Sequence, residues 1–198
     1  VLHSLHRYLG EVTLPKPMTC EPNPKFAGQP TLKQMTETAL NHLAHNNQRG
    51  FLLMVESASI DKQSHERKPC GSIGELDQLN DAVDSALAFA AKHPHTLIIV
   101  TADHAQAAQL IPEESLYSKY PIPIYTPGKL ARITTPEGST MAVNYATNNF
   151  PYEEHTGANV PVFANSEAVG IVPAFVQQRD LFNIMSDYLG LNKLPKTR

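Results

Sequence analysis

Five side chains that can bind metal ions follow two short apolar runs of the chain. The runs cover 51–55 and 96–101, are flanked by helical patterns, and are each typical of a buried strand. The metal-binding side chains after them are Glu56, Asp61, His65, Asp103 and His104. Ligands of open α/β sheets bind beyond the carboxyl ends of the strands, so we expect these five side chains to share one crevice. Carboxylates with imidazoles suit Zn²⁺, and a neighbouring all-oxygen site suits Mg²⁺.

The spacing of Asp61 and His65 suggests a local metal-binding pair. Residues four apart lie on the same side of a helical turn, so a carboxylate and an imidazole placed this way can grip one ion. The pattern is weak by itself, because exposed helices show it by chance. Its value here comes from its position directly after a predicted buried strand.

The surrounding elements are predicted from hydrophobic periodicity. An amphipathic helix over 73–92 separates the two apolar runs, which indicates a βαβ unit with parallel strands and a right-handed crossover. We expect further helices over about 31–45 and 179–189. Additional strands are predicted near 8–14, at 140–145 and at 160–164.

The rest of the chain is expected to be irregular. Prolines among tyrosines and small polar residues predict a surface excursion over about 111–139 inside a single domain of residues 1–198. A polar turn then carries His155 just before the run at 160–164. Spacing alone fits a metal ligand and an exposed loop histidine equally well.

Composition excludes several classes of protein. With 198 residues, 41% hydrophobic content and a formal charge of −3, the chain can form a core but has no basic surface for nucleic acid. No run approaches the roughly 18 apolar residues of a membrane helix, so we expect no membrane span. The chain does not begin with Met, which fits processing or excision from a longer protein.

The chain has two cysteines, Cys20 and Cys70. From the residues alone they are either unrelated thiols or one disulfide. A bridge would close a loop of about 50 residues, contribute about 4 kcal/mol of stability, and imply an oxidising compartment.

Three separated motifs in order resemble the C-terminal half of bacterial alkaline phosphatase: Glu56–His65, Thr101–His104 and Glu154–Gly157. The likeness runs from about Cys20 to Leu191. It implies an α/β fold with a partial, mostly parallel sheet and flanking helices. It also favours the bridge Cys20–Cys70, a homodimer, and a periplasmic or secreted protein.

The resemblance implies a role for each matching residue. Asp61, His65 and His155 look like the protein ligands of a first zinc. Asp103 and His104 look like ligands of a second zinc, and Glu56 like a carboxylate of a Mg²⁺ site, both sites incomplete in this chain. Lys62 stands where the family reaches substrate phosphate through water.

The same resemblance implies a phosphate monoester hydrolase in which this chain supplies metal ligands but no catalytic serine. Asp84-Ser85 imitates the family's nucleophile motif, but it falls inside the predicted helix 73–92, where we expect both side chains to face solvent. We therefore interpret the chain as a C-terminal fragment that is inactive alone. The alternatives are a non-catalytic metal-binding or interaction module, or another two-metal hydrolase or mutase of the wider superfamily.

Overall fold

The computed structural model describes residues 15–111, 130–145, 148 and 150–191. Their contacts form two compact units between which the chain passes repeatedly. The first unit comprises residues 1–28, 57–77 and 104–158, and the second comprises 29–56, 78–103 and 159–198. That the whole chain is one domain stays a prediction, and the strand predicted at 8–14 lies outside the described residues.

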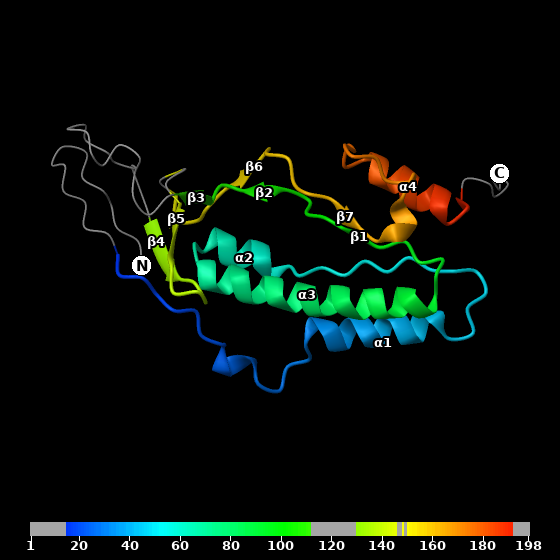
Figure 1. Cartoon of the computed structure of the whole chain (residues 1–198), viewed down its shortest axis with the longest axis horizontal. Helices are drawn as coiled ribbons and strands as arrows, with labels where there is room; N and C mark the ends of the chain where they lie inside the picture. The colour runs from blue at the N-terminus through cyan, green and yellow to red at the C-terminus, as the bar shows by residue number, and fades with distance from the viewer. Residues whose placement is uncertain (1–14, 112–129, 146–147, 149, 192–198) are drawn as a thin grey trace. The chain divides into compact units, whose positions relative to one another are not determined.

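An antiparallel sheet of three strands forms the core of the first unit (Figure 1). Its order is β3-β5-β4, with β3 at Gln109–Ile111, β4 at Leu130–Thr134 and β5 at Thr140–Asn144. The hairpin between β4 and β5 turns at Gly138, whose φ of +82° is readily adopted only by glycine. The strand predicted at 140–145 is thus confirmed.

The core of this unit includes Ala131, Ile133, Val143 and Tyr145, each at most 5% exposed. Cys20 and Cys70 form a disulfide that packs against this cluster. The bridge joins the segment before the sheet to the first turn of helix α3 (Pro69–Lys92). The pairing implied by the family resemblance is therefore confirmed.

The predicted irregular excursion over 111–139 is wrong in its last part. Residues 112–129 lie outside the described residues, but β4 occupies 130–134. Its side chains pack into the core because Leu130, Ala131 and Ile133 are apolar and buried. The strand was not predicted because prolines lie on both sides of it, and a proline-rich composition indicated an irregular segment.

Short elements complete the first unit. Helix α2 (Ser59–His65) ends just before α3, and Ser64 and Ser72 exchange a hydroxyl hydrogen bond of 3.0 Å between the two helices. Strands β2 (Ala105–Gln106) and β6 (His155–Thr156) pair antiparallel. A 3₁₀ turn, η1, covers Pro24–Phe26.

Helix α1 (Leu32–Ala44) and the later part of α3 dominate the second unit (Figure 1). Thr31 caps α1 through a reciprocal capping box with Gln34. Gln78 and Ser85 of α3 hydrogen-bond to the Leu32 amide and the Glu37 carboxylate of α1. The predicted helices are confirmed, and α3 begins four residues before its predicted start.

The second unit also holds strands β1 (Ile99–Val100) and β7 (Phe163–Ala164), which pair antiparallel. The 3₁₀ turn η2 (Ser166–Ala168) and helix α4 (Asp180–Tyr188) follow. In the described part of the chain, no helix is long and apolar enough to cross a membrane.

The prediction of a mostly parallel sheet is wrong, because every strand pair in the described ranges is antiparallel. The buried strand predicted at 51–55 is wrong: these residues pair with no other strand of the described chain, although their exposure alternates as in one. Leu52 and Met54 are 60% and 84% exposed, while the Phe51 ring contacts Phe89 of α3 edge-on. An apolar run can favour an extended conformation, but it becomes a β-strand only where a second strand lies beside it to share backbone hydrogen bonds.

Candidate metal centre

Asp61 and His65 lie on helix α2 as their spacing predicts. Asp61 Oδ1 is 3.3 Å from His65 Nε2, so the two side chains share one side of the helix. A carboxylate and an imidazole are therefore held together by a single helical turn.

His155 reaches this pair through backbone pairing. It opens β6, where it is registered against Gln106 of β2, and the Ala107 amide donates to the Glu154 carbonyl at 3.1 Å. His104 directly precedes β2, so the short ladder also brings these two histidines together. Their rings stack with centroids 3.5 Å apart.

Asp61 is the point on which the three imidazoles converge. Its Oδ1 lies 3.3 Å from His65 Nε2, 3.3 Å from His155 Nε2 and 3.7 Å from His104 Nε2. Ligand atoms about 2.0–2.1 Å from one tetrahedral Zn²⁺ lie about 3.3–3.4 Å from one another. The distances from Asp61 to His65 and His155 therefore fit ligands of one metal ion such as zinc, whereas His104 lies farther from Asp61 and the two Nε2 atoms of His65 and His155 lie closer together than that spacing.

A second group of three possible metal ligands overlaps this set but has His104 in place of His65. Atoms of Asp61, His104 and His155 all lie within 4.8 Å of one another. His65 and His155 approach with their Nε2 atoms 2.8 Å apart. Lone pairs at that separation repel unless a proton or a cation lies between them. The four side chains are 24–47% exposed, so an ion can enter from solvent.

Two neighbours orient these ligands. His65 Nδ1 donates to the Glu153 carbonyl at 2.5 Å, which leaves Nε2 unprotonated in the neutral ring and able to bind a metal. Gln106 Nε2 donates to Asp61 Oδ1. Sequence reasoning missed both partners, because nothing local in the sequence links residues 45 or 88 positions apart.

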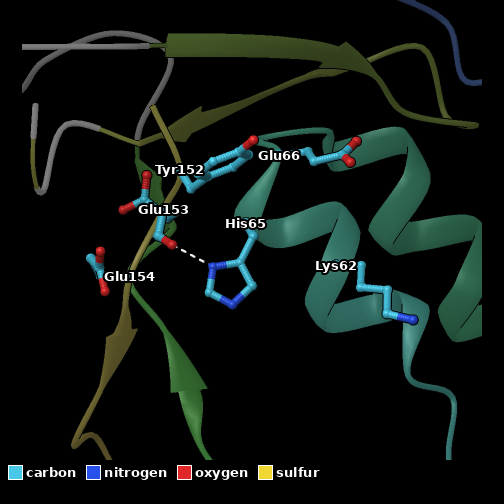
Figure 2. A pocket seen from close by; sticks show the side chains of 6 residues that line it. All are labelled: Lys62, His65, Glu66, Tyr152, Glu153 and Glu154. Carbon is cyan, nitrogen blue, oxygen red and sulfur yellow. Dashed lines mark hydrogen bonds between the residues drawn. The ribbon is translucent and has the colours of Figure 1, made fainter. Parts of the chain in front are cut away.

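An open cavity of about 400 Å³ lies beside His65 (Figure 2). Its lining residues come from α2, the residue directly after it, and the segment before β6: Lys62, His65, Glu66, Tyr152, Glu153 and Glu154. Figure 2 shows the Lys62 side chain extending away from the His65 ring. Its proposed contact with substrate phosphate stays a prediction.

Glu56 and Asp103 belong to the second unit, so their roles as metal ligands also stay predictions. Glu56 is exposed, and the backbone carbonyl of Asp103 accepts a hydrogen bond from Gln178 Nε2 at 2.9 Å. Within the first unit the structure gathers Asp61, His65, His104 and His155.

The nucleophile-like Asp84-Ser85 lies inside α3, as predicted, and Asp84 is exposed. The expected exposure of Ser85 is wrong. Its side chain is buried against α1, and its hydroxyl donates to Glu37 Oε1 at 2.9 Å and to the Asp81 carbonyl. The position of Ser85 beside α1 accounts for its burial.

Comparison with known proteins relates this geometry to a family. The family model described as "Alkaline phosphatase" matches residues 12–191. The chain belongs to the alkaline phosphatase family. It is 42% identical over 185 residues to alkaline phosphatase of Escherichia fergusonii, covering 93% of this chain and 37% of that protein.

Other relatives extend this result. Alkaline phosphatase H of Pseudomonas aeruginosa is 42% identical over 176 residues, which is 88% of this chain and 35% of that one. Streptomycin-6-phosphate phosphatase of Streptomyces griseus is 40% identical over 173 residues, covering 83% and 36% respectively. The chain thus spans just over a third of the length of these relatives.

A solved structure shares the fold. It is a mutant of TAB5 alkaline phosphatase with Mg bound in its M3 site, with a TM-score of 0.56 and 24% identity. The similarity covers 85% of this chain and 44% of that one. The chain therefore has an α/β alkaline-phosphatase-like fold, with the antiparallel pairs described above.

Proposed function

We propose that the intact protein hydrolyses phosphate monoesters as a metal-dependent alkaline phosphatase, and that this chain supplies most of its zinc ligands. The observation that carries the proposal is the convergence of His65, His104 and His155 on one carboxylate oxygen of Asp61. Membership of the family adds the reaction class, which the four side chains alone would leave open.

In this proposal Asp61, His65 and His155 hold one zinc, and His104 with Asp103 contributes to a second. Glu56 contributes to a magnesium site. When bound, paired metal ions stabilise the attacking and leaving oxygens of an in-line displacement and lower the pKa of bound water.

The chain's own residues prepare the site for this chemistry. Asp61 supplies a negative charge for a cation, and Gln106 fixes the direction of its Oδ1. The Glu153 carbonyl holds the proton of His65 on Nδ1. Lys62, at the cavity, supplies a positive charge that attracts an anionic ester.

The nucleophilic serine of the proposed reaction lies outside this chain, so we expect no turnover from the chain alone. The proposed substrates are phosphate monoesters. We further propose a homodimer in the periplasm or outside the cell, where the disulfide between Cys20 and Cys70 persists.

Isothermal titration of the purified chain with zinc tests the metal site. We expect one tight site, a loss of affinity of more than about 100-fold in His155→Ala, and unchanged binding in His95→Ala. His95 is the matched control because its side chain is 96% exposed and belongs to the second unit. Absence of zinc binding by the unaltered chain would overturn the proposed site.

Hydrolysis of an aryl phosphate tests the division of labour. We expect no turnover by this chain with added zinc and magnesium. We expect turnover by the full-length protein that is lost on chelation and restored by zinc. Turnover by the chain alone would contradict the placement of the nucleophile elsewhere. An inactive full-length protein that binds zinc would favour a non-catalytic metal-binding module.

A further inference from the structure

The side chain of Arg67 is buried beside the proposed metal centre. It follows α2, only 1% of the side chain is exposed, and its backbone is left-handed with a φ of +56°. An isolated buried guanidinium would be strongly destabilising, because the charge loses its hydration. Here each of its five N–H groups has an acceptor.

Arg67 Nε donates to Glu153 Oε2 at 2.8 Å, forming an ion pair with a carboxylate that is fully buried. The remaining donors reach acceptors on the segment before Glu153, at 2.9–3.1 Å: the Asn148 side-chain oxygen and the carbonyls of Phe150, Pro151 and Tyr152.

Apolar burial does not explain the path of that segment. Phe150 and Tyr152 are 63% and 62% exposed, so their side chains add little to a core. Their carbonyls instead accept hydrogen bonds from the Arg67 guanidinium. The charged hydrogen bonds of one arginine therefore hold the carbonyls of Phe150, Pro151 and Tyr152 in the approach to β6.

Glu153 links this arrangement to the metal ligands. Its amide donates to the His65 carbonyl at 2.8 Å, and its carbonyl accepts from His65 Nδ1 at 2.5 Å. Two residues later the chain reaches His155. A shift of Glu153 would therefore change the orientation of the His65 ring and the position of His155 together.

We propose that Arg67 and Glu153 are positioning residues that set the tautomer of His65 and the place of His155 for metal binding. This inference rests on the proposed function. Orienting partners of metal-bound histidines typically change metal affinity by about 10- to 100-fold. Lysine has three donors on a flexible stem and cannot replace the planar five-donor fork of Arg67.

The test combines zinc titration with nitrogen NMR of the histidine rings in Arg67→Lys. We expect affinity to fall about 10- to 100-fold. We also expect the Nδ1 and Nε2 shifts of metal-free His65 to move toward a mixture of tautomers. A role in stability alone would lower the melting temperature and leave the His65 tautomer in the folded protein unchanged.

Lys68→Met is the matched control. Lys68 lies next to Arg67 and pairs with Glu66 at the surface, where their side chains are 60% and 43% exposed. We expect zinc affinity and His65 signals like those of the unaltered chain. If Arg67→Lys does not fold, Glu153→Gln decides, because it keeps the side-chain size and backbone groups while removing the charge.

Normal zinc affinity and an unchanged His65 tautomer in a folded Arg67→Lys, or in Glu153→Gln where Arg67→Lys does not fold, would overturn the inference. Failure of the proposed function gives a different result. The unaltered chain would then bind no zinc, while the NMR comparison would still report whether Arg67 and Glu153 orient His65.

Discussion

The two units differ in what they hold buried and in which segments expose apolar side chains. The first unit pairs even a fully buried carboxylate, Glu153, with Arg67, and it packs a disulfide against its sheet. Both units expose some large apolar side chains, such as Phe150 and Tyr152 of the first, but the second exposes them along the extended run 51–55, at Leu52 and Met54. Internal pairing suits a site whose ligands must keep fixed positions, whereas exposed apolar groups favour contacts with other protein surfaces.

The largest expected effect is on the metal centre of the first unit. Asp61→Ala removes the oxygen on which all three imidazoles converge, so we expect zinc affinity to fall more than about 100-fold. Calorimetric titration measures this loss. Asp84→Ala, an exposed aspartate in the second unit, is the control. Equal losses of zinc affinity in both variants would show that zinc binding does not depend on the Asp61 site of the first unit.

Removal of the disulfide is expected to destabilise the first unit more than the second. The bridge joins positions 50 residues apart, so its loss in Cys20→Ser/Cys70→Ser should cost about 4 kcal/mol of unfolding free energy. Urea unfolding measures the loss of unfolding free energy for the whole chain. Hydrogen exchange should show faster exchange in β4 and β5, with α1 less affected. Equal acceleration in α1 would mean that the units unfold together.

A smaller effect is expected at high pH from a buried tyrosine of the first unit. Burial raises the pKa of Tyr145 from 10.0 to about 12, and the charge of Glu153 adds to this shift. The folded protein thus favours the neutral phenol. The contribution of Tyr145 to the free energy of unfolding is fully present below about pH 10. It is lost as the pH rises to about 12, which lowers that free energy by about 2–3 kcal/mol.

Unfolding of Tyr145→Phe across pH 9 to 12 measures that contribution, and its stability should fall less steeply than that of the unaltered chain. Tyr152→Phe is the control, because that side chain is 62% exposed. Tyr188→Phe gives the comparison in the second unit, where burial and the hydrogen bond to Glu167 raise the pKa of Tyr188 to about 12. Identical slopes for Tyr145→Phe and Tyr152→Phe would contradict this assignment.

The smallest expected effect concerns self-association through the second unit. We expect the chain to self-associate through its exposed apolar run 51–55, and Met54→Lys, which places a charge there, to weaken that association several-fold in sedimentation experiments. Met35→Lys on α1 is the control, since Met35 is 49% exposed but helical. If the helix variant weakens association as much, the extended run has no special part in it.

Local sequence patterns predicted the helices and the Asp61–His65 pair well. The capping residue Thr31, the apolar stripes and the spacing of four all act within one or two helical turns. The same reasoning failed for the parallel sheet and for Ser85. Strand pairing and helix contacts depend on which distant segment lies alongside, and an apolar run or a serine carries no information on that.

The sequence by itself named the candidate metal ligands, and its family motifs predicted the bridge between Cys20 and Cys70. Only the tertiary structure decided that Glu153 orients His65 and that Arg67 pairs with Glu153. The physical reason is distance along the chain. Partners 86 to 90 residues apart meet only after the chain has folded, and both the buried pair of Arg67 with Glu153 and the contact of His65 with His155 depend on that meeting.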